Sequence, residues 1–265
     1  MLLTQEQLEE LKINGYLIIR NVLTAQEIEQ LRKVSIDFFT NESNPIIYIF
    51  SGKTKSNAMN AIPGLRFLLK NEKIAQIMKD VCGPDVRYAH HSDAHYNMLS
   101  GWHKDNYGDD DWAVGPQGET YHAYKMAFYL QDHSNNNYGL TVRKGSHLLR
   151  ELNKGEVIDL HSKPGDAVVF DMRISHIGKE PDLFEKILKF IFRNPKTQAK
   201  LFERYRKMMG VPDKISVFFG FGVPNRFTQE HIDKTIARQN KQNKASNYTI
   251  DPEVVKNLEE VGLHY

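Results

Sequence analysis

The stretch 164–176, PGDAVVFDMRISH, indicates the fold more clearly than any other part of the chain. A Pro-Gly-Asp turn begins a short apolar run, 167–170, and a histidine follows this run by six residues. A run of four apolar residues that starts at a turn is typical of a buried strand. The stretch therefore predicts a buried strand with a histidine just beyond its end.

Similar strand-sized runs, separated by turn residues, fill the middle of the sequence. They lie at 87–98, 121–130, 140–143, 157–160 and 214–221. Many short strands with turn signals between them favour a β-sandwich or barrel over a parallel α/β sheet. We see no internal repeat and no linker, so we expect one domain over residues 1–265.

Helical patterns flank these strands. Thr4 and Thr24 each precede a Gln or Glu by three residues, which is the spacing of a capping box at the start of a helix. An inserted segment at about 183–210, divided by Pro195, predicts two helices between strands, and residues from about 227 to 265 predict closing helices. We therefore expect a mostly β protein with N-terminal, inserted and C-terminal helices.

The composition excludes several classes of protein. Of 265 residues, 40% are hydrophobic, which is too many for a disordered chain. The net charge of +2, from 35 basic and 33 acidic residues, is too balanced to indicate nucleic acid as the main partner. The apolar runs are far shorter than the roughly 18–20 residues that cross a membrane, so we expect no transmembrane segment. The single cysteine, Cys82, favours a cytoplasmic location.

The inserted segment departs from this balance of charge. Residues 183–209 contain eight basic and two acidic residues, and Phe184, Ile187, Leu188 and Ile191 lie at helical spacing opposite the lysines. Such a segment fits a lid over the barrel mouth, a contact between copies in a homo-oligomer, or a surface that lies on anionic lipid. We favour the lid and leave the other two open.

Metal-binding potential is concentrated in two places. In an extended segment His103 and Asp105 point to the same face, and His176 adds a second imidazole 71 residues later (176 − 105 = 71). Two imidazoles and one carboxylate are the ligand set that holds non-haem Fe(II) and leaves other positions open. The alternative is that His176 is a hydrogen-bonded histidine at a strand end. We interpret His147 as a turn residue.

Taken together, four segments resemble the phytanoyl-CoA dioxygenase family of Fe(II)- and 2-oxoglutarate-dependent oxygenases. They are TQEQLEELKINGYLIIRNVLTAQEIEQL at 4–31, GWHKD at 101–105, YLQDHSNNNYGLTVRKGSHL at 129–148, and PGDAVVFDMRISH at 164–176. The resemblance extends from about residue 4 to residue 222. It implies a double-stranded β-helix core, which is a jelly-roll or cupin-like barrel.

The resemblance also implies roles for individual residues. His103, Asp105 and His176 match the iron ligands of the family. A basic residue on the strand after the second histidine binds the far carboxylate of 2-oxoglutarate, and Lys214 with Ser216 takes this position here. The family usually has an arginine about eleven residues after the histidine, whereas here the separation is 38 residues (214 − 176 = 38). Further candidates for contact with 2-oxoglutarate are Arg173, Lys125, Asn97 and Tyr88.

The implied activity is hydroxylation of an unactivated C–H bond in a small organic substrate, with consumption of O2 and release of succinate and CO2. The related halogenases have a small residue in place of the carboxylate, so Asp105 favours hydroxylation over halogenation. The sequence does not identify the substrate. Two alternatives remain at this stage: a cupin-like barrel that binds metal or sugar without oxygenase activity, and a cupin-type isomerase or epimerase.

Overall fold

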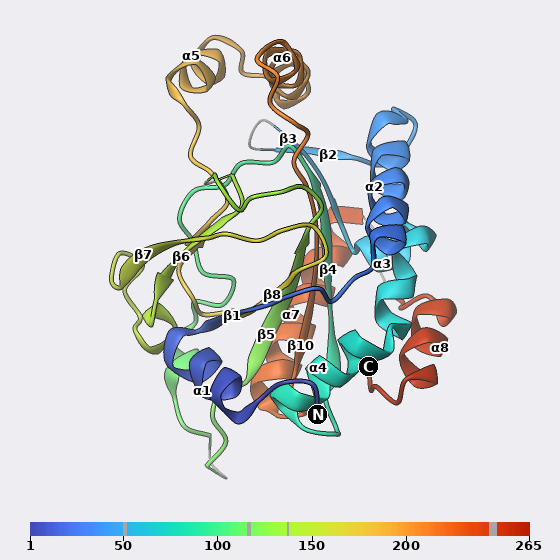
Figure 1. Ribbon diagram of the computed structural model, residues 1–265, viewed down its shortest axis with the longest axis vertical. Coiled ribbons are helices and arrows are strands. Elements are labelled where there is room, and N and C mark those ends of the chain that lie inside the picture. Colours follow the sequence, from blue (N-terminus) through green and yellow to red (C-terminus); the bar gives the residue numbers. More distant parts are fainter. Residues whose placement is uncertain (50–51, 116–117, 137, 244–247) are drawn as a thin grey trace.

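Two antiparallel sheets face each other in the centre of the molecule (Figure 1). The computed structural model describes the chain apart from residues 50–51, 116–117, 137 and 244–247. The strands of the larger sheet are β1 (Tyr16–Ile19), β2 (Ile47–Ile49), β3 (Gly52–Ser56), β4 (Arg87–Tyr96), β5 (Ala123–Tyr129), β8 (Ala167–Asp171) and β10 (Ile215–Gly222). The strands of the smaller sheet are β6 (Leu140–Lys144), β7 (Glu156–Leu160) and β9 (His176–Ile177).

The order of the strands brings distant parts of the sequence together. Within the described residues, the larger sheet has the order β1-β8-β5-β10-β4-β3-β2, and the smaller sheet has the order β7-β6-β9. The strand β10 therefore pairs with both β4 and β5, although an inserted segment separates it from them in sequence. The central strands β5 and β10 of the larger sheet therefore lie side by side.

The two faces of the larger sheet pack against different layers. On β5, Met126 and Phe128 belong to the core that the sheet shares with the helices, whereas Ala127 and Tyr129 pack towards the smaller sheet. This alternation follows from the two-residue period of a strand. Side chains with the parity of Tyr129 therefore project into the space between the two sheets.

Helices cover the outer face of the larger sheet. They are α1 (Gln5–Asn14), α2 (Ala25–Thr40), α3 (Ala58–Ala61), the 3₁₀ helix η1 (Pro63–Lys70), α4 (Glu72–Cys82) and α8 (Pro252–Glu260). The helix α7 (Arg226–Asn243) packs on the opposite face, where Phe227 lies against Ala123 of β5 and His231 contacts His91 of β4. Two short 3₁₀ turns, η2 (Asp109–Trp112) and η3 (Ser146–Leu148), lie in loops. Thr4 and Thr24 both form the predicted capping boxes, so α1 and α2 begin where the sequence indicated.

The inserted segment forms two helices, α5 (Leu183–Ile191) and α6 (Pro195–Met208), between β9 and β10. They stand together at one end of the molecule, beyond the edge of the sheets (Figure 1). Pro195 separates them, as predicted, and occupies the first turn of α6. Among the residues that the structure describes, no helix combines the length and apolar character needed to span a bilayer.

The predicted strands are confirmed to within about two residues, but the expectation of a mostly β protein is wrong. More of the described residues lie in helices than in strands, so the fold is mixed α/β. The reason is that the larger sheet has an apolar outer face, and the terminal helices are needed to bury it. The apolar run at 46–50 forms β2, while Phe50 lies outside the described residues.

Candidate metal centre

Backbone hydrogen bonds bring the two halves of the candidate metal site together. The amide of His103 donates to the carbonyl of His176 over 3.0 Å, and the amide of His176 donates to the carbonyl of His103 over 2.9 Å. The amide of Asp105 donates to the Met172 carbonyl over 2.9 Å. One ligand atom from each of His103, Asp105 and His176 then lies within 4.8 Å of the others. The predicted convergence of these three residues is confirmed.

The hydrogen bonds of the two imidazoles fix their tautomers. The Nδ1 atom of His103 lies 2.8 Å from the Gly101 carbonyl, and Nδ1 of His176 lies 3.0 Å from the Ile174 carbonyl. Because a carbonyl only accepts, each Nδ1 carries the proton and each Nε2 keeps a free lone pair. Burial, together with the neighbouring His103, lowers the pKa of His176 to about 3. This imidazole is therefore neutral and ready to ligate a metal near neutral pH.

The carboxylate of Asp105 is the third candidate metal ligand. Its Oδ2 atom is buried without a hydrogen bond from any described residue, 3.0 Å from Nζ of Lys125 and 3.9 Å from Nε2 of His176. Burial alone would raise the pKa of Asp105, but Lys125 and the two histidines lower it well below its usual value. Two imidazole nitrogens and one ionised carboxylate fit Fe(II).

A cavity of about 60 Å³ adjoins His103 and His176 and is lined by side chains from the inner face of β5 and β10. Lys214 and Ser216 both line it. The Nζ of Lys214 lies 3.3 Å from the Gly139 carbonyl, and it forms no ion pair with a carboxylate among the described residues. Desolvation, with smaller contributions from Arg206 and Lys179, lowers the pKa of Lys214 to about 7.

Lys125 also lines this cavity, but its amine already forms an ion pair. It lies on β5 with the same parity as Tyr129, so its side chain projects between the sheets to Asp105. The ion pair of 3.0 Å with Asp105 makes Lys125 a partner of the candidate metal ligand. It is therefore a weaker candidate than Lys214 for binding a second carboxylate.

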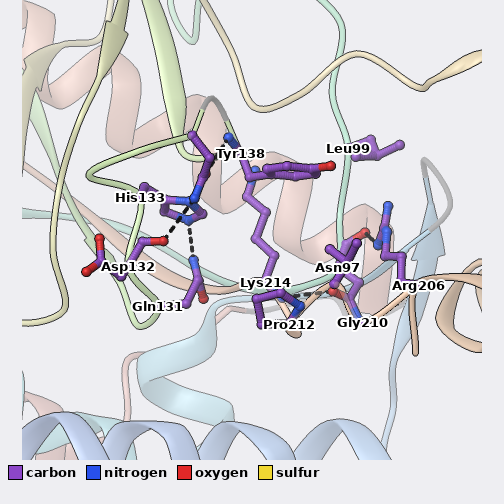
Figure 2. Close-up of a pocket in the computed structure, with 12 residues that line it drawn as sticks. Asn97, Leu99, Gln131, Asp132, His133, Tyr138, Arg206, Gly210, Pro212 and Lys214 are labelled. Atoms are coloured by element: carbon purple, nitrogen blue, oxygen red, sulfur yellow. Dashed lines mark hydrogen bonds between the residues drawn. The ribbon is translucent and has the colours of Figure 1, made fainter. Parts of the chain in front are cut away.

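Asn97 lies beside a different cavity. This second cavity, of about 190 Å³, also borders Lys214, whose side chain runs between Asn97 and Arg206 on one side and Gln131 and His133 on the other (Figure 2). The side-chain amide of Asn97 donates to Asp213 over 2.8 Å, and its oxygen accepts from the backbone amide of Lys214 over 2.8 Å. Asn97 thus holds the start of β10 in place and does not line the metal cavity.

Two other candidates do not reach the metal cavity either. The guanidinium of Arg173 forms a 2.8 Å ion pair with Asp171 and stacks over the Tyr121 ring at 4.2 Å. It borders a separate cavity with Trp112. Tyr88 is buried in the core between the larger sheet and the helices. The structure therefore leaves Lys214 and Ser216 as the candidates for the far carboxylate of 2-oxoglutarate.

A buried polar chain behind the metal site was not predicted. His91 bonds to Asp93 at 2.8 Å and to His231 at 3.1 Å, and His231 bonds to Asn106 at 2.8 Å. The two-residue spacing of Asp93 from His91 could have indicated the first contact. No pattern in the sequence indicates that His231, on α7, meets a strand 140 residues away.

His95 has a different position from that of its neighbours. It lines the metal cavity, whereas His91 is buried in the polar chain. The two histidines share one face of β4, yet only His95 reaches the cavity. His147, interpreted as a turn residue, lies in η3 with its Nε2 3.0 Å from the Lys12 carbonyl.

The family assignment rests on a match that covers more than half of the chain. The sequence model described as phytanoyl-CoA dioxygenase (PhyH) matches residues 11–180, which include His103, Asp105 and His176. The chain belongs to the phytanoyl-CoA dioxygenase family. Lys214 and Ser216 lie outside the matched range. No curated protein matches the chain significantly.

Solved structures of Fe(II)- and 2-oxoglutarate-dependent enzymes share the fold of this family member. The non-heme alpha ketoglutarate dependent epimerase SnoN from nogalamycin biosynthesis has a TM-score of 0.60 and 13% identity, with 83% of this chain and 82% of that chain covered. EctD from S. alaskensis, solved with 2-oxoglutarate and 5-hydroxyectoine, has a TM-score of 0.59 and 16% identity, with 83% and 76% covered. HygX from Streptomyces hygroscopicus, solved with nickel and 2-oxoglutarate, has a TM-score of 0.58 and 15% identity, with 84% and 88% covered.

Several of these solved structures contain a metal and the cosubstrate. Structures of SnoN and EctD contain iron, and structures of SnoN, EctD and HygX contain 2-oxoglutarate or alpha ketoglutarate, which is the same compound. His103, Asp105 and His176 form the candidate triad for the metal in this chain. The solved relatives include an epimerase and a carbocyclase, so the family fold serves several reactions.

Proposed function

We propose that this phytanoyl-CoA dioxygenase family member is an Fe(II)- and 2-oxoglutarate-dependent hydroxylase that acts on a small organic substrate. The observation that carries the proposal is a cavity that is lined by both candidate histidine ligands and also by Lys214. The two facing sheets correspond to the double-stranded β-helix that the family resemblance implies. In this proposal residues 1–265 act as one domain, and the single cysteine suits the cytoplasm.

The proposal assigns the three candidate ligands to the metal. His103 and His176 present Nε2 lone pairs, and Asp105 presents an ionised oxygen. When bound, iron with 2-oxoglutarate and O2 supplies the oxidation of a C–H bond and the release of succinate and CO2. The protein positions the ligands by backbone hydrogen bonds and keeps both imidazoles in the ligating tautomer.

The proposal assigns the far carboxylate of 2-oxoglutarate to Lys214 and Ser216. A charged amine that is poorly solvated and has no acidic partner costs free energy, and an anion that binds beside it lowers this cost. Arg173 already forms an ion pair with Asp171, and Lys125 already forms one with Asp105. Neither cation is therefore available to bind a second carboxylate. Lysine binds as a point charge, and the Ser216 hydroxyl adds a directional donor beside it.

The first experiment tests the metal assignment. Purified His103→Ala and His176→Ala proteins are titrated anaerobically with Fe(II) and 2-oxoglutarate, and succinate formation is then measured in air. We expect the weak visible absorption of the iron–2-oxoglutarate complex in the unmodified protein and its loss in both variants, with succinate at background. His161→Ala, away from the metal cavity, is the control. Unchanged absorption and turnover in folded His176→Ala protein would remove the metal assignment.

The second experiment separates hydroxylation from the alternatives. Substrate candidates are incubated with isotopically labelled O2, and the product is analysed by mass spectrometry. A hydroxylase transfers one labelled oxygen atom to the product for each succinate released. An epimerase or cyclase also releases succinate but leaves the product unlabelled, whereas a binding barrel or a simple isomerase releases none.

A further inference from the structure

The helix α5 presents an apolar face to solvent. Six of its nine residues are large and apolar, and five of these six are exposed: Leu183 (75%), Phe184 (42%), Ile187 (46%), Phe190 (88%) and Ile191 (60%). The sixth, Leu188, is half-buried. At 100° per residue these five positions fall on one continuous side of the helix. A helix on a water-facing surface normally shows the opposite arrangement.

The inner side of α5 carries the polar contacts instead. Glu185 is buried and forms a 2.9 Å ion pair with Arg206 of α6. The side chain of Gln198 donates to the carbonyl of Phe192 at the end of α5. The ring of Phe184, at the margin of the apolar face, packs on Tyr205 at 4.4 Å. These contacts fix which side of α5 faces outwards.

The exposed charges around this face are basic. The two acidic residues of the inserted segment are both paired, Glu185 with Arg206 and Glu203 with Lys53 over 3.0 Å. Two exposed cations in or just after α5 form no ion pair within the described part of the chain: Lys186 and Arg193. Lys186 lies one turn from both Leu183 and Phe190 on the helix, so its amine borders the apolar face. Two acidic residues, Glu180 and Asp182, precede the helix, and Asp182 is its N-cap.

We propose that the outer face of α5 is a docking surface for an anionic lipid bilayer. An apolar helix face with lysine and arginine at its margins is typical of a helix that lies in the membrane interface. The high exposure shows that this face does not pack on the barrel mouth, so the expected lid contact is absent. A second copy fits poorly, because a symmetric contact through α5 would bring like charges together.

Vesicle binding by the full-length protein tests this proposal. The protein is mixed with vesicles of phosphatidylcholine alone, or of phosphatidylcholine and phosphatidylglycerol in equal parts, and separated by flotation. We expect binding to the anionic vesicles, and little binding to the neutral ones. Removing Lys186 and Arg193 by substitution with alanine should lower the partition coefficient about fivefold per charge. Phe190→Ser with Ile191→Ser should abolish binding.

A matched control uses an exposed apolar residue elsewhere. Ile13 of α1 is 63% exposed, so Ile13→Ser changes the surface hydrophobicity without touching α5, and it should bind anionic vesicles as the unmodified protein does. Absence of binding to anionic vesicles, or equal binding to both vesicle types, would overturn the proposal. Self-association that Phe190→Ser abolishes, without vesicle binding, would instead assign the face to a second copy of the chain.

Discussion

Lys214 combines a desolvated amine with no acidic partner among the described residues, and desolvation lowers its pKa to about 7. The amine is charged below that pH and becomes neutral above it. Since a carboxylate binds the charged form, we expect the affinity for 2-oxoglutarate to fall as the pH rises above about 7, approaching tenfold per pH unit. Above this pH, binding should also take up a proton, which calorimetry in buffers of different ionisation enthalpy measures directly.

Substitutions at Lys214 test whether this amine is the anchor. Lys214→Met should weaken 2-oxoglutarate binding roughly 10–100-fold, which is the effect of losing a hydrogen bond to a charged group. Lys214→Arg retains a charge at every accessible pH, so it should bind with little pH dependence. An affinity that is independent of pH in the unmodified protein, or unchanged in Lys214→Met, would contradict the assignment.

The ion pair between Lys125 and Asp105 leads to a separate prediction. Lys125→Met keeps the length of the side chain but removes the cation 3.0 Å from the candidate ligand oxygen. We expect the affinity for Mn(II), used as a stable substitute for Fe(II), to fall about tenfold or more, because residues that orient a metal ligand contribute on this scale. Lys125→Arg should recover most of the affinity. The measurement is a metal titration, and equal affinity in all three proteins would show that the ion pair does not orient Asp105.

At the scale of elements, the buried side chain of Arg206 joins the two inserted helices to each other and to the end of β4. Arg206 pairs with Glu185 of α5 and also donates to the carbonyl of Asn97, beyond the end of β4, over 2.8 Å. Asn97 in turn accepts from the backbone amide of Lys214. The inserted helices therefore support the start of β10, on which the proposed 2-oxoglutarate anchor depends.

Breaking this pair should loosen the inserted helices. Glu185→Ala leaves the Arg206 charge buried, and we expect it to cost about 3–5 kcal/mol in the stability of this region. Hydrogen exchange should then accelerate in α5 and α6, with little change in β5 and β8. The control is Lys33→Ala, which removes an exposed ion pair with Asp37 and should leave the stability nearly unchanged. Equal exchange in α5 and α6 after both substitutions would show that the buried pair does not fasten them.

At the scale of the whole molecule, the candidate metal site connects the loop at 101–106 to β9. A metal that binds only the folded chain therefore stabilises the entire fold. At a concentration one hundred times Kd, the gain in the free energy of unfolding is about 2.7 kcal/mol. For a chain of this size that corresponds to a rise in Tm of roughly 5–10 °C. Thermal unfolding with Mn(II) and 2-oxoglutarate should show this shift, and a chelator should reverse it. The same rise in His103→Ala protein would indicate that the metal binds elsewhere.

The sequence by itself determined the features that depend on neighbouring residues. Alternation and turn residues located the strands, and the spacing of Thr4 and Thr24 from their partners located two helix starts. The pair His103 and Asp105 was also recognisable, because two-residue spacing places both side chains on one face of an extended segment. These features are local, so they follow from backbone geometry and hydrogen bonding over a few residues.

Only the tertiary structure decided which of the candidate cations has an acidic partner from a distant part of the chain. Lys125, Arg173 and Lys214 were all candidates to bind a carboxylate. Arg173 pairs with Asp171, two residues before it in sequence, but only the fold brings Asp105 to Lys125 and none of the described aspartates or glutamates to Lys214. It likewise turned the apolar side of α5 outwards, because Glu185 pairs with a residue on α6. Such contacts depend on which distant segments meet when the core is buried, and no local pattern in the sequence encodes that meeting.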